Sequence, residues 1–156
     1  MHIHGYRWVG EKAVYDKESI RRPLPAEEPT STSPSDVVER RREAAVEWRA
    51  TEVPPIETVL WLVKPPARIR GTWEEPEEAG EWLGRQLMEY APRFASARDR
   101  VAERSAAYVA SAVERLTWGG DVSLGFYLSR PLFLFLALVT CSPNRTRPEL
   151  PCPVRK

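Results

Sequence analysis

The chain has two histidines and two cysteines, His2, His4, Cys141 and Cys152, and they lie near its two ends. Zinc takes tetrahedral nitrogen and sulfur ligands, usually from pairs that are close in sequence. His-x-His is a poor pair of this kind, and the two cysteines are eleven positions apart. The spacing therefore favours polar residues scattered over the termini, and the sequence predicts no metal site and no cofactor.

A catalytic thiol requires a base beside it, and no histidine occurs outside the N-terminus. Cys141 follows an apolar run and precedes Ser142 and Pro143, which favours a buried structural cysteine. A Cys141–Cys152 disulfide is the alternative. No apolar leader follows Met1, so we expect a cytoplasmic protein with free thiols.

Other residues that could do acid–base or phosphate chemistry form no recognised motif. A group of glutamates resembles the charged first turn of a helix more than a catalytic pair: Glu74, Glu75, Glu77 and Glu78. No phosphate-binding loop, nucleophile elbow, dinucleotide fingerprint or zinc finger is present. The sequence leans against an enzyme without excluding one.

Arginine clusters raise the alternative of a small DNA- or RNA-binding regulator. The most compact cluster is flanked by Glu39 and Glu43 and consists of Arg40, Arg41 and Arg42. Two smaller pairs are Arg68 with Arg70 and Arg145 with Arg147. Phosphate neutralisation could use them, but no recognition-helix pattern accompanies them and the net charge is only +1.

Six tryptophans are many for a chain of 156 residues, and aromatic side chains are enriched at binding hot spots. Trp73 and Trp82 are nine positions apart, so they would face opposite sides of one continuous helix. One of them should then be exposed, or covered by the N-terminal segment or a second subunit. The main hypothesis is a non-enzymatic accessory domain that binds an unidentified protein or itself, with Trp73, Trp82 and the Arg40–Arg42 cluster as candidate contacts.

Residues 122–141 are about as long as a membrane span, which gives membrane association as a further alternative. Arg130 lies near the middle, where a charge costs about 2.5–3.5 kcal/mol on insertion scales. Burial of this segment in a protein core removes that cost, so we expect no membrane partner.

The hydrophobic pattern predicts a mostly α fold. Helices are expected over 34–50, 74–90 and 92–118, and the last two form a helical hairpin at the centre of a small irregular bundle. The apolar segment 131–141 is expected as a buried helix. Residues 1–20 are β-prone, with a turn at Gly10, and suggest a short docked hairpin. The alternative is an α+β fold in which 57–63 and 132–140 are strands.

Proline distribution sets the domain limits. Four of the fifteen prolines lie in 23–34 and four in 143–153. We therefore expect an N-terminal segment 1–20, a disordered linker 21–33, one helical domain over 34–141 and a proline-rich basic tail over 142–156.

Overall fold

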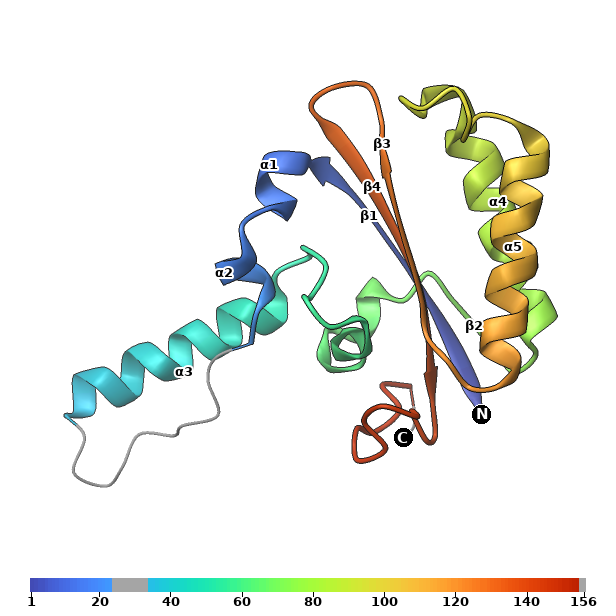
Figure 1. The fold of residues 1–156 in the computed structure, drawn as a ribbon. Helices are drawn as coiled ribbons and strands as arrows, with labels where there is room; N and C mark the ends of the chain where they lie inside the picture. The colour runs from blue at the N-terminus through green and yellow to red at the C-terminus, as the bar shows by residue number, and fades with distance from the viewer. Residues whose placement is uncertain (24–33, 155–156) are drawn as a thin grey trace.

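The computed structural model describes residues 1–23 and 34–154 (Figure 1). In chain order, with η for 3-10 helices, its elements are β1 (His2–Glu11), α1 (Lys12–Tyr15), α2 (Glu18–Arg21), α3 (Ser35–Ala50), η1 (Thr58–Val63), η2 (Pro66–Arg68), β2 (Gly71–Trp73), α4 (Pro76–Tyr90), η3 (Ala91–Arg93), α5 (Ala102–Thr117), β3 (Val122–Tyr127) and β4 (Leu132–Cys141).

A four-stranded antiparallel sheet in the order β2-β1-β4-β3 forms the centre of the fold. The two long strands β1 and β4 pair over ten residues, from His2 opposite Cys141 to Glu11 opposite Leu132. The first and last strands of the chain are thus neighbours, which brings the two ends of the sequence to one end of the sheet.

Each face of the sheet packs against a separate apolar cluster. The helical hairpin of α4 and α5 covers one face, while η1, the N-terminal helices and the C-terminal segment lie on the other (Figure 1). Even-numbered residues of β1, such as Tyr6 and Trp8, belong to the second cluster, and Ile3 belongs to the first. This alternation follows from the two-residue repeat of a strand.

The prediction of a mostly α fold is wrong, because residues 132–141 form the central strand β4 and the fold is α+β. Both faces of β4 are covered, so the segment is apolar throughout and shows no strand alternation. The α+β alternative is correct for this segment but wrong for 57–63, most of which is the 3-10 helix η1. The N-terminal hairpin is also wrong, since β1 runs through Gly10 and leads into α1.

Two of the predicted helices are confirmed, and the third is shorter than expected. α3 and α4 match the predictions for 34–50 and 74–90. The helix predicted over 92–118 begins only at Ala102. Other bonds hold the segment before it: the Ala95 N–H donates to the Tyr127 carbonyl, and Arg100 donates to the Phe94 carbonyl at 2.8 Å. The expected hairpin of α4 and α5 is present.

The segments outside the predicted domain take part in the same sheet and clusters. Strand β1, from the predicted N-terminal segment, is central in the sheet, and Cys152, from the predicted tail, is buried in the second cluster. Residues 24–33 of the predicted linker lie outside the described residues. No helix in the described parts of the chain is long and apolar enough to cross a membrane.

Candidate metal centre

Pairing of β1 with β4 places three of the four histidine and cysteine side chains together. His2 lies directly opposite Cys141, and His4 is two residues further along β1. Opposite residues of an antiparallel pair, and residues two apart on one strand, project from the same face of a sheet. The register therefore puts both imidazoles and the Cys141 thiol on the face that carries the second apolar cluster.

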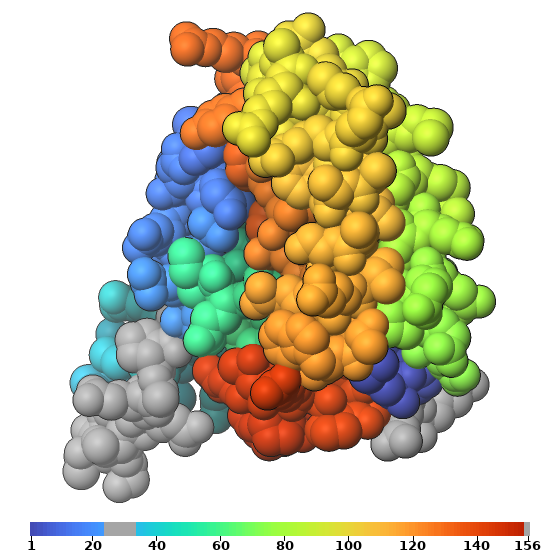
Figure 2. Space-filling view, turned by 45° about the vertical axis from the view of Figure 1, so that its right-hand side comes forward, coloured from blue at the N-terminus to red at the C-terminus, as the bar shows by residue number. Residues whose placement is uncertain are grey.

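The C-terminal segment brings the fourth side chain, Cys152, back to this face. After β4 the chain turns at Asn144, whose buried amide donates to the Asp121 carboxylate and to the Thr140 carbonyl at 2.7 Å. Figure 2 shows the C-terminal segment, in red, beside the dark blue start of β1 at one end of the molecule. The fold of this segment thus sets the position of the Cys152 thiol.

The donor atoms of His2, His4, Cys141 and Cys152 all lie within 4.8 Å of one another. His4 Nε2 is 3.2 Å from Cys141 Sγ and 3.5 Å from Cys152 Sγ, and His2 Nδ1 is 3.4 Å from Cys152 Sγ. Zn–S bonds of about 2.3 Å and Zn–N bonds of about 2.05 Å at tetrahedral angles place nitrogen and sulfur about 3.6 Å apart. The three observed separations lie within about 0.4 Å of that spacing.

A second set of groups surrounds the four donors. His4 Nδ1 is 2.8 Å from the Thr72 hydroxyl on β2, a contact that fixes the ring orientation and leaves Nε2 directed at the sulfurs. Metal-bound histidines usually have such a partner on their other nitrogen. Tyr6 lies two residues beyond His4, is 1% exposed, and its hydroxyl has no hydrogen-bond partner among the described residues. An orphaned hydroxyl of this kind suits a site that holds charged sulfur.

Burial controls the protonation of these groups. It lowers the pKa of His4 to about 4, with His2 as a further cause, so the imidazole is neutral near pH 7 as a metal ligand must be. Burial, followed by the bond to Cys152, raises the pKa of the Cys141 thiol to about 11. Burial likewise raises the pKa of Tyr6, with the two cysteines as lesser causes. A divalent cation would reverse the thiol preference and stabilise the thiolates.

The donor set fits zinc better than other common divalent ions. Two thiols and two imidazoles are the Cys2His2 combination of structural zinc sites, whereas magnesium and calcium take oxygen ligands. His4, Cys141 and Cys152 are buried and His2 is half-buried, so four protein ligands enclose the centre. Such a closed set leaves no open position for a reacting water.

Sequence spacing therefore misjudged these four residues, which the fold brings together rather than leaving scattered. Strand pairing and a returning tail bring the ligands together, and neither is visible in local spacing. The signal that was available is His-x-His in a β-prone segment, because that spacing puts two rings on one face of a strand.

The tryptophans singled out from the sequence pack against each other. Trp73 belongs to β2 and Trp82 to α4, so no single helix contains both, and their ring centroids are 5.4 Å apart. Both indoles cover Gly5 of β1, where an added Cβ would lie 3.0–3.1 Å from their atoms. Trp82 is buried and Trp73 is half-buried, and because they belong to different elements, the requirement that one continuous helix would expose one of them does not apply.

None of the arginines singled out from the sequence belongs to the group of four donors. Arg40, Arg41 and Arg42 are on α3, a helix with no buried residue that projects from the body (Figure 1). Arg40 pairs with Asp36 on the same helix at 3.1 Å. Members of the two smaller arginine pairs contact other residues. Arg68 forms an ion pair with Glu52, Arg147 forms one with Glu57, and Arg145 donates to the Trp118 carbonyl. The glutamates 74, 75, 77 and 78 are exposed around the start of α4, as a helix first turn predicts.

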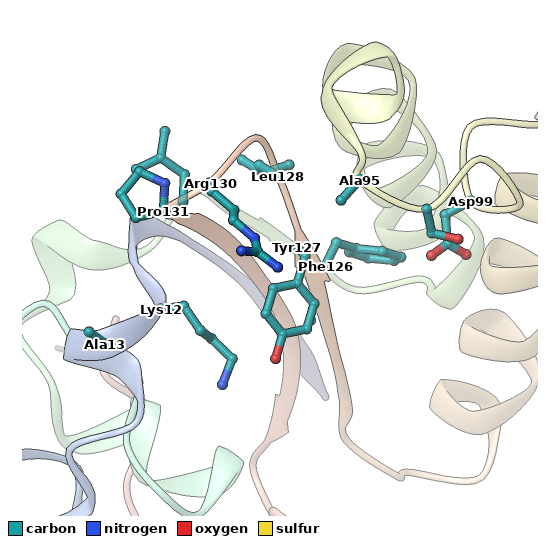
Figure 3. Close-up of a pocket in the computed structure, with 12 residues that line it drawn as sticks. Lys12, Ala13, Ala95, Asp99, Phe126, Tyr127, Leu128, Arg130 and Pro131 are labelled. Atoms are coloured by element: carbon teal, nitrogen blue, oxygen red, sulfur yellow. The ribbon is translucent and has the colours of Figure 1, made fainter.

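A cavity of about 810 Å³ lies around the β3–β4 hairpin and brings few polar groups together. Figure 3 shows Lys12 on one side of the hairpin and Asp99 on the other. Lys12 is paired with Asp16, and its ammonium lies over the Tyr15 ring at 5.2 Å. Asp99 accepts a bond from Tyr108 at 2.9 Å. Lys12 and Asp99 thus have partners within the protein, and Arg130 is the one other charged residue of this lining, so the group of four donors is the better candidate site.

Comparison of the chain with protein-family models, with curated proteins and with solved structures finds no match. The assignment of function therefore depends on the geometry of the site.

Proposed function

We propose that the protein binds one zinc ion through His2 Nδ1, His4 Nε2, Cys141 Sγ and Cys152 Sγ. The observation that carries this proposal is the convergence of the four donor atoms within 4.8 Å, at nitrogen–sulfur separations suited to a tetrahedral ion. The ligands come from the first strand, the last strand and the C-terminal segment. Thr72 orients His4 from β2, so four distant parts of the sequence depend on the same centre.

The role of the ion is structural in this proposal. Catalytic zinc sites keep one position for water or substrate, whereas four protein ligands here leave none. The ion would fasten residues 142–154 to the β1–β4 pair, to which the hydrogen bonds of Asn144 and the packing of Cys152 and Leu150 also attach them. A short segment rich in proline buries little apolar surface, so metal binding supplies stability that packing does not.

We also propose that the protein acts by binding a partner rather than by catalysis. The zinc site uses both histidines and both cysteines of the chain, so none is left as a nucleophile or general base. The cavity beside the β3–β4 hairpin has three charged lining residues, and two of them, Lys12 and Asp99, are paired within the protein while the third is Arg130. A zinc-stabilised interaction domain is the function that these features support.

The experiment is measurement of metal content by mass spectrometry on full-length protein produced in zinc-supplemented medium. We expect one zinc per chain in the wild type and in Ser123→Ala, a control at an exposed position of β3. Cys152→Ser should lose the metal. A wild type that is folded, as judged by circular dichroism, and binds no zinc in the reduced state contradicts the proposal.

The orienting role of Thr72 gives a finer test. Removal of an outer-shell partner typically weakens metal affinity about 10–100-fold. We expect Thr72→Val to show this loss in competition with a chromogenic chelator, while Thr117→Val on α5, whose hydroxyl bonds its own helix, keeps the wild-type affinity. Equal affinities would mean that the His4–Thr72 contact does not support a metal ligand.

A further inference from the structure

The edge of strand β1 is covered by β2 over only part of its length. The two strands pair from Ile3 opposite Trp73 to Gly5 opposite Gly71. The Arg70 N–H donates to the Gly5 carbonyl at 2.7 Å, and the chain of β2 then leaves the edge. Residues of β1 beyond Gly5 have β4 on one side and no strand on the other among the described residues.

The backbone groups at this open edge can be assigned from the hydrogen-bond pattern. The N–H and C=O of one residue point to the same side of an antiparallel strand, and successive residues alternate. The Gly5 carbonyl points to the β2 side, so Arg7 and Val9 point that way too. Neither has a backbone hydrogen bond on that side within the described parts of the chain. The edge therefore offers two N–H donors and two carbonyl acceptors.

A cleft of about 240 Å³ lies beside these groups and is basic. Its lining includes Arg7 and Val9 themselves, with Arg68, Arg70 and Glu52 among the other residues. The lining carries three arginines and one glutamate, and Glu89, which pairs with Arg7 at 4.0 Å, reduces the local charge to +1. The walls also include the aromatic side chains Trp8, Trp61 and Tyr90. Backbone bonding groups, positive charge and aromatic surface thus occur together.

Not all of this positive charge is neutralised within the protein. Arg68 pairs with Glu52 at 3.4 Å, and Arg7 bonds Gln86 at 2.8 Å and pairs with Glu89 at 4.0 Å. Arg70 is exposed, and its side chain has no hydrogen bond or ion pair among the residues that the structure describes. An incoming carboxylate could pair with Arg70 without breaking an existing contact.

We propose that the open edge of β1 binds an extended acidic peptide segment of a partner protein, which adds as a strand beside Arg7 and Val9. Strand addition obtains affinity from main-chain hydrogen bonds and specificity from the side chains around the edge. Here the surrounding arginines select glutamate or aspartate. The inference rests on the proposed binding role and is independent of the zinc ion.

Two alternatives, a second copy of the chain as the partner and β3 as the binding edge, fit the structure less well. A second copy of the chain would bring its own Arg7 and Arg70 against the same cleft, and like charges oppose that contact. The other sheet edge, β3, is shielded at one end, where Ala95 donates to the Tyr127 carbonyl. The hollow beside β3 contains one arginine and one aspartate, Arg115 and Asp121, and has no net charge. Charge complementarity therefore points to β1 and to an acidic partner.

Fluorescence anisotropy of labelled peptides on the zinc-loaded full-length protein tests the proposal. The probe is a short peptide that alternates valine and glutamate. We expect saturable binding that weakens as salt is raised, and at least tenfold weaker binding of a valine–lysine peptide. The valine–glutamate peptide with every backbone nitrogen methylated should not bind. Equal binding of the glutamate and lysine peptides, or no binding of either, overturns the proposal.

Two pairs of variants locate the binding edge. Val9→Pro removes an edge N–H where proline is tolerated in a strand, and Ser123→Pro makes the same change on β3. Arg70→Glu reverses an exposed charge in the cleft, and Arg98→Glu does so in the loop before α5. We expect about tenfold weaker binding for Val9→Pro and Arg70→Glu only.

Zinc content and circular dichroism of each variant separate loss of the edge from loss of the fold. Binding that survives both Val9→Pro and Arg70→Glu contradicts the proposal. Binding that is weakened by Ser123→Pro alone also contradicts it. Sedimentation reports whether the chain instead pairs with itself, which would also overturn an acidic partner. Because zinc content is measured on the same samples, failure of the zinc proposal is recognised separately.

Discussion

Replacement of Asn144 by alanine should destabilise the C-terminal segment and the metal centre together. The Asn144 amide donates to the Thr140 carbonyl and to Asp121, and its oxygen accepts the N–H groups of Thr146 at 2.9 Å and Arg147 at 3.1 Å. Three neutral bonds at about 1 kcal/mol and one to a carboxylate at about 2 kcal/mol give about 5 kcal/mol. Water reaching the freed groups recovers part of this, so we expect about 3 kcal/mol.

Thermal unfolding of the zinc-loaded protein measures the effect, which corresponds to a fall in Tm of about 6–12 °C for a domain of this size. The matched control is Thr146→Ala, an exposed neighbour that should change stability by less than about 0.5 kcal/mol. Because the turn at Asn144 positions Cys152, Asn144→Ala should also bind zinc more weakly. A loss below about 1 kcal/mol with unchanged zinc affinity would refute the role given to this turn.

Three further predictions concern other parts of the molecule. Burial lowers the pKa of Lys64 to about 8, so the unfolded chain holds that proton more tightly than the folded one. In urea unfolding, the wild type should gain stability relative to Lys64→Met as pH rises from about 8 to about 10, and a pH-independent difference in the free energy of unfolding would contradict this. An added Cβ would lie 2.5 Å from a valine methyl of α5 at Gly80, and 3.5 Å from one at Gly84. In the same urea assay, Gly84→Ala should therefore stabilise the protein by about 0.5–1 kcal/mol, and Gly80→Ala should be at least about 1 kcal/mol less stable than Gly84→Ala. Hydrogen peroxide should oxidise the zinc-free thiols of Cys141 and Cys152 to one intramolecular disulfide, with two hydrogens lost from the chain and two waters formed; intact mass under non-reducing conditions checks this, and a covalent dimer would be the contrary result.

The helices could be predicted from the sequence because their patterns are local. The glutamates and Pro76 at the start of α4, and the apolar stripe that includes Leu83 and Leu87, define that helix without reference to the rest of the chain. Gly80 of α4 lies against Val113 of α5, where an added Cβ would be 2.5 Å from a methyl of that valine.

Strand β4 could not be predicted in the same way, because its character depends on what covers it. Residues 133–141 are buried, and apolar residues occupy both faces of the strand up to Val139, so no alternation with polar residues occurs there. Ser129 and Pro131, which resemble a helix start, precede a strand instead. Periodicity carries no information when every position is apolar.

The metal centre was also hidden, since its ligands meet through the longest-range pairing in the fold. His2 and Cys141 are 139 positions apart in sequence and directly opposite in the sheet. Rules based on closely spaced ligand pairs apply where one loop supplies two ligands. Here one strand supplies two, its partner supplies the third and a returning tail the fourth, so the strand register had to be known first.

Titration of the reduced, metal-free protein with Co²⁺ tests the central claim most directly, because the absorption spectrum of cobalt reports both ligand type and geometry. We predict saturation at one ion per chain, intense visible bands of a tetrahedral ion and an ultraviolet sulfur-to-cobalt charge-transfer band, all displaced by Zn²⁺. The charge-transfer band should weaken in Cys152→Ser. A weak octahedral spectrum, or a spectrum that Cys152→Ser leaves unchanged, would contradict a centre built from His2, His4, Cys141 and Cys152.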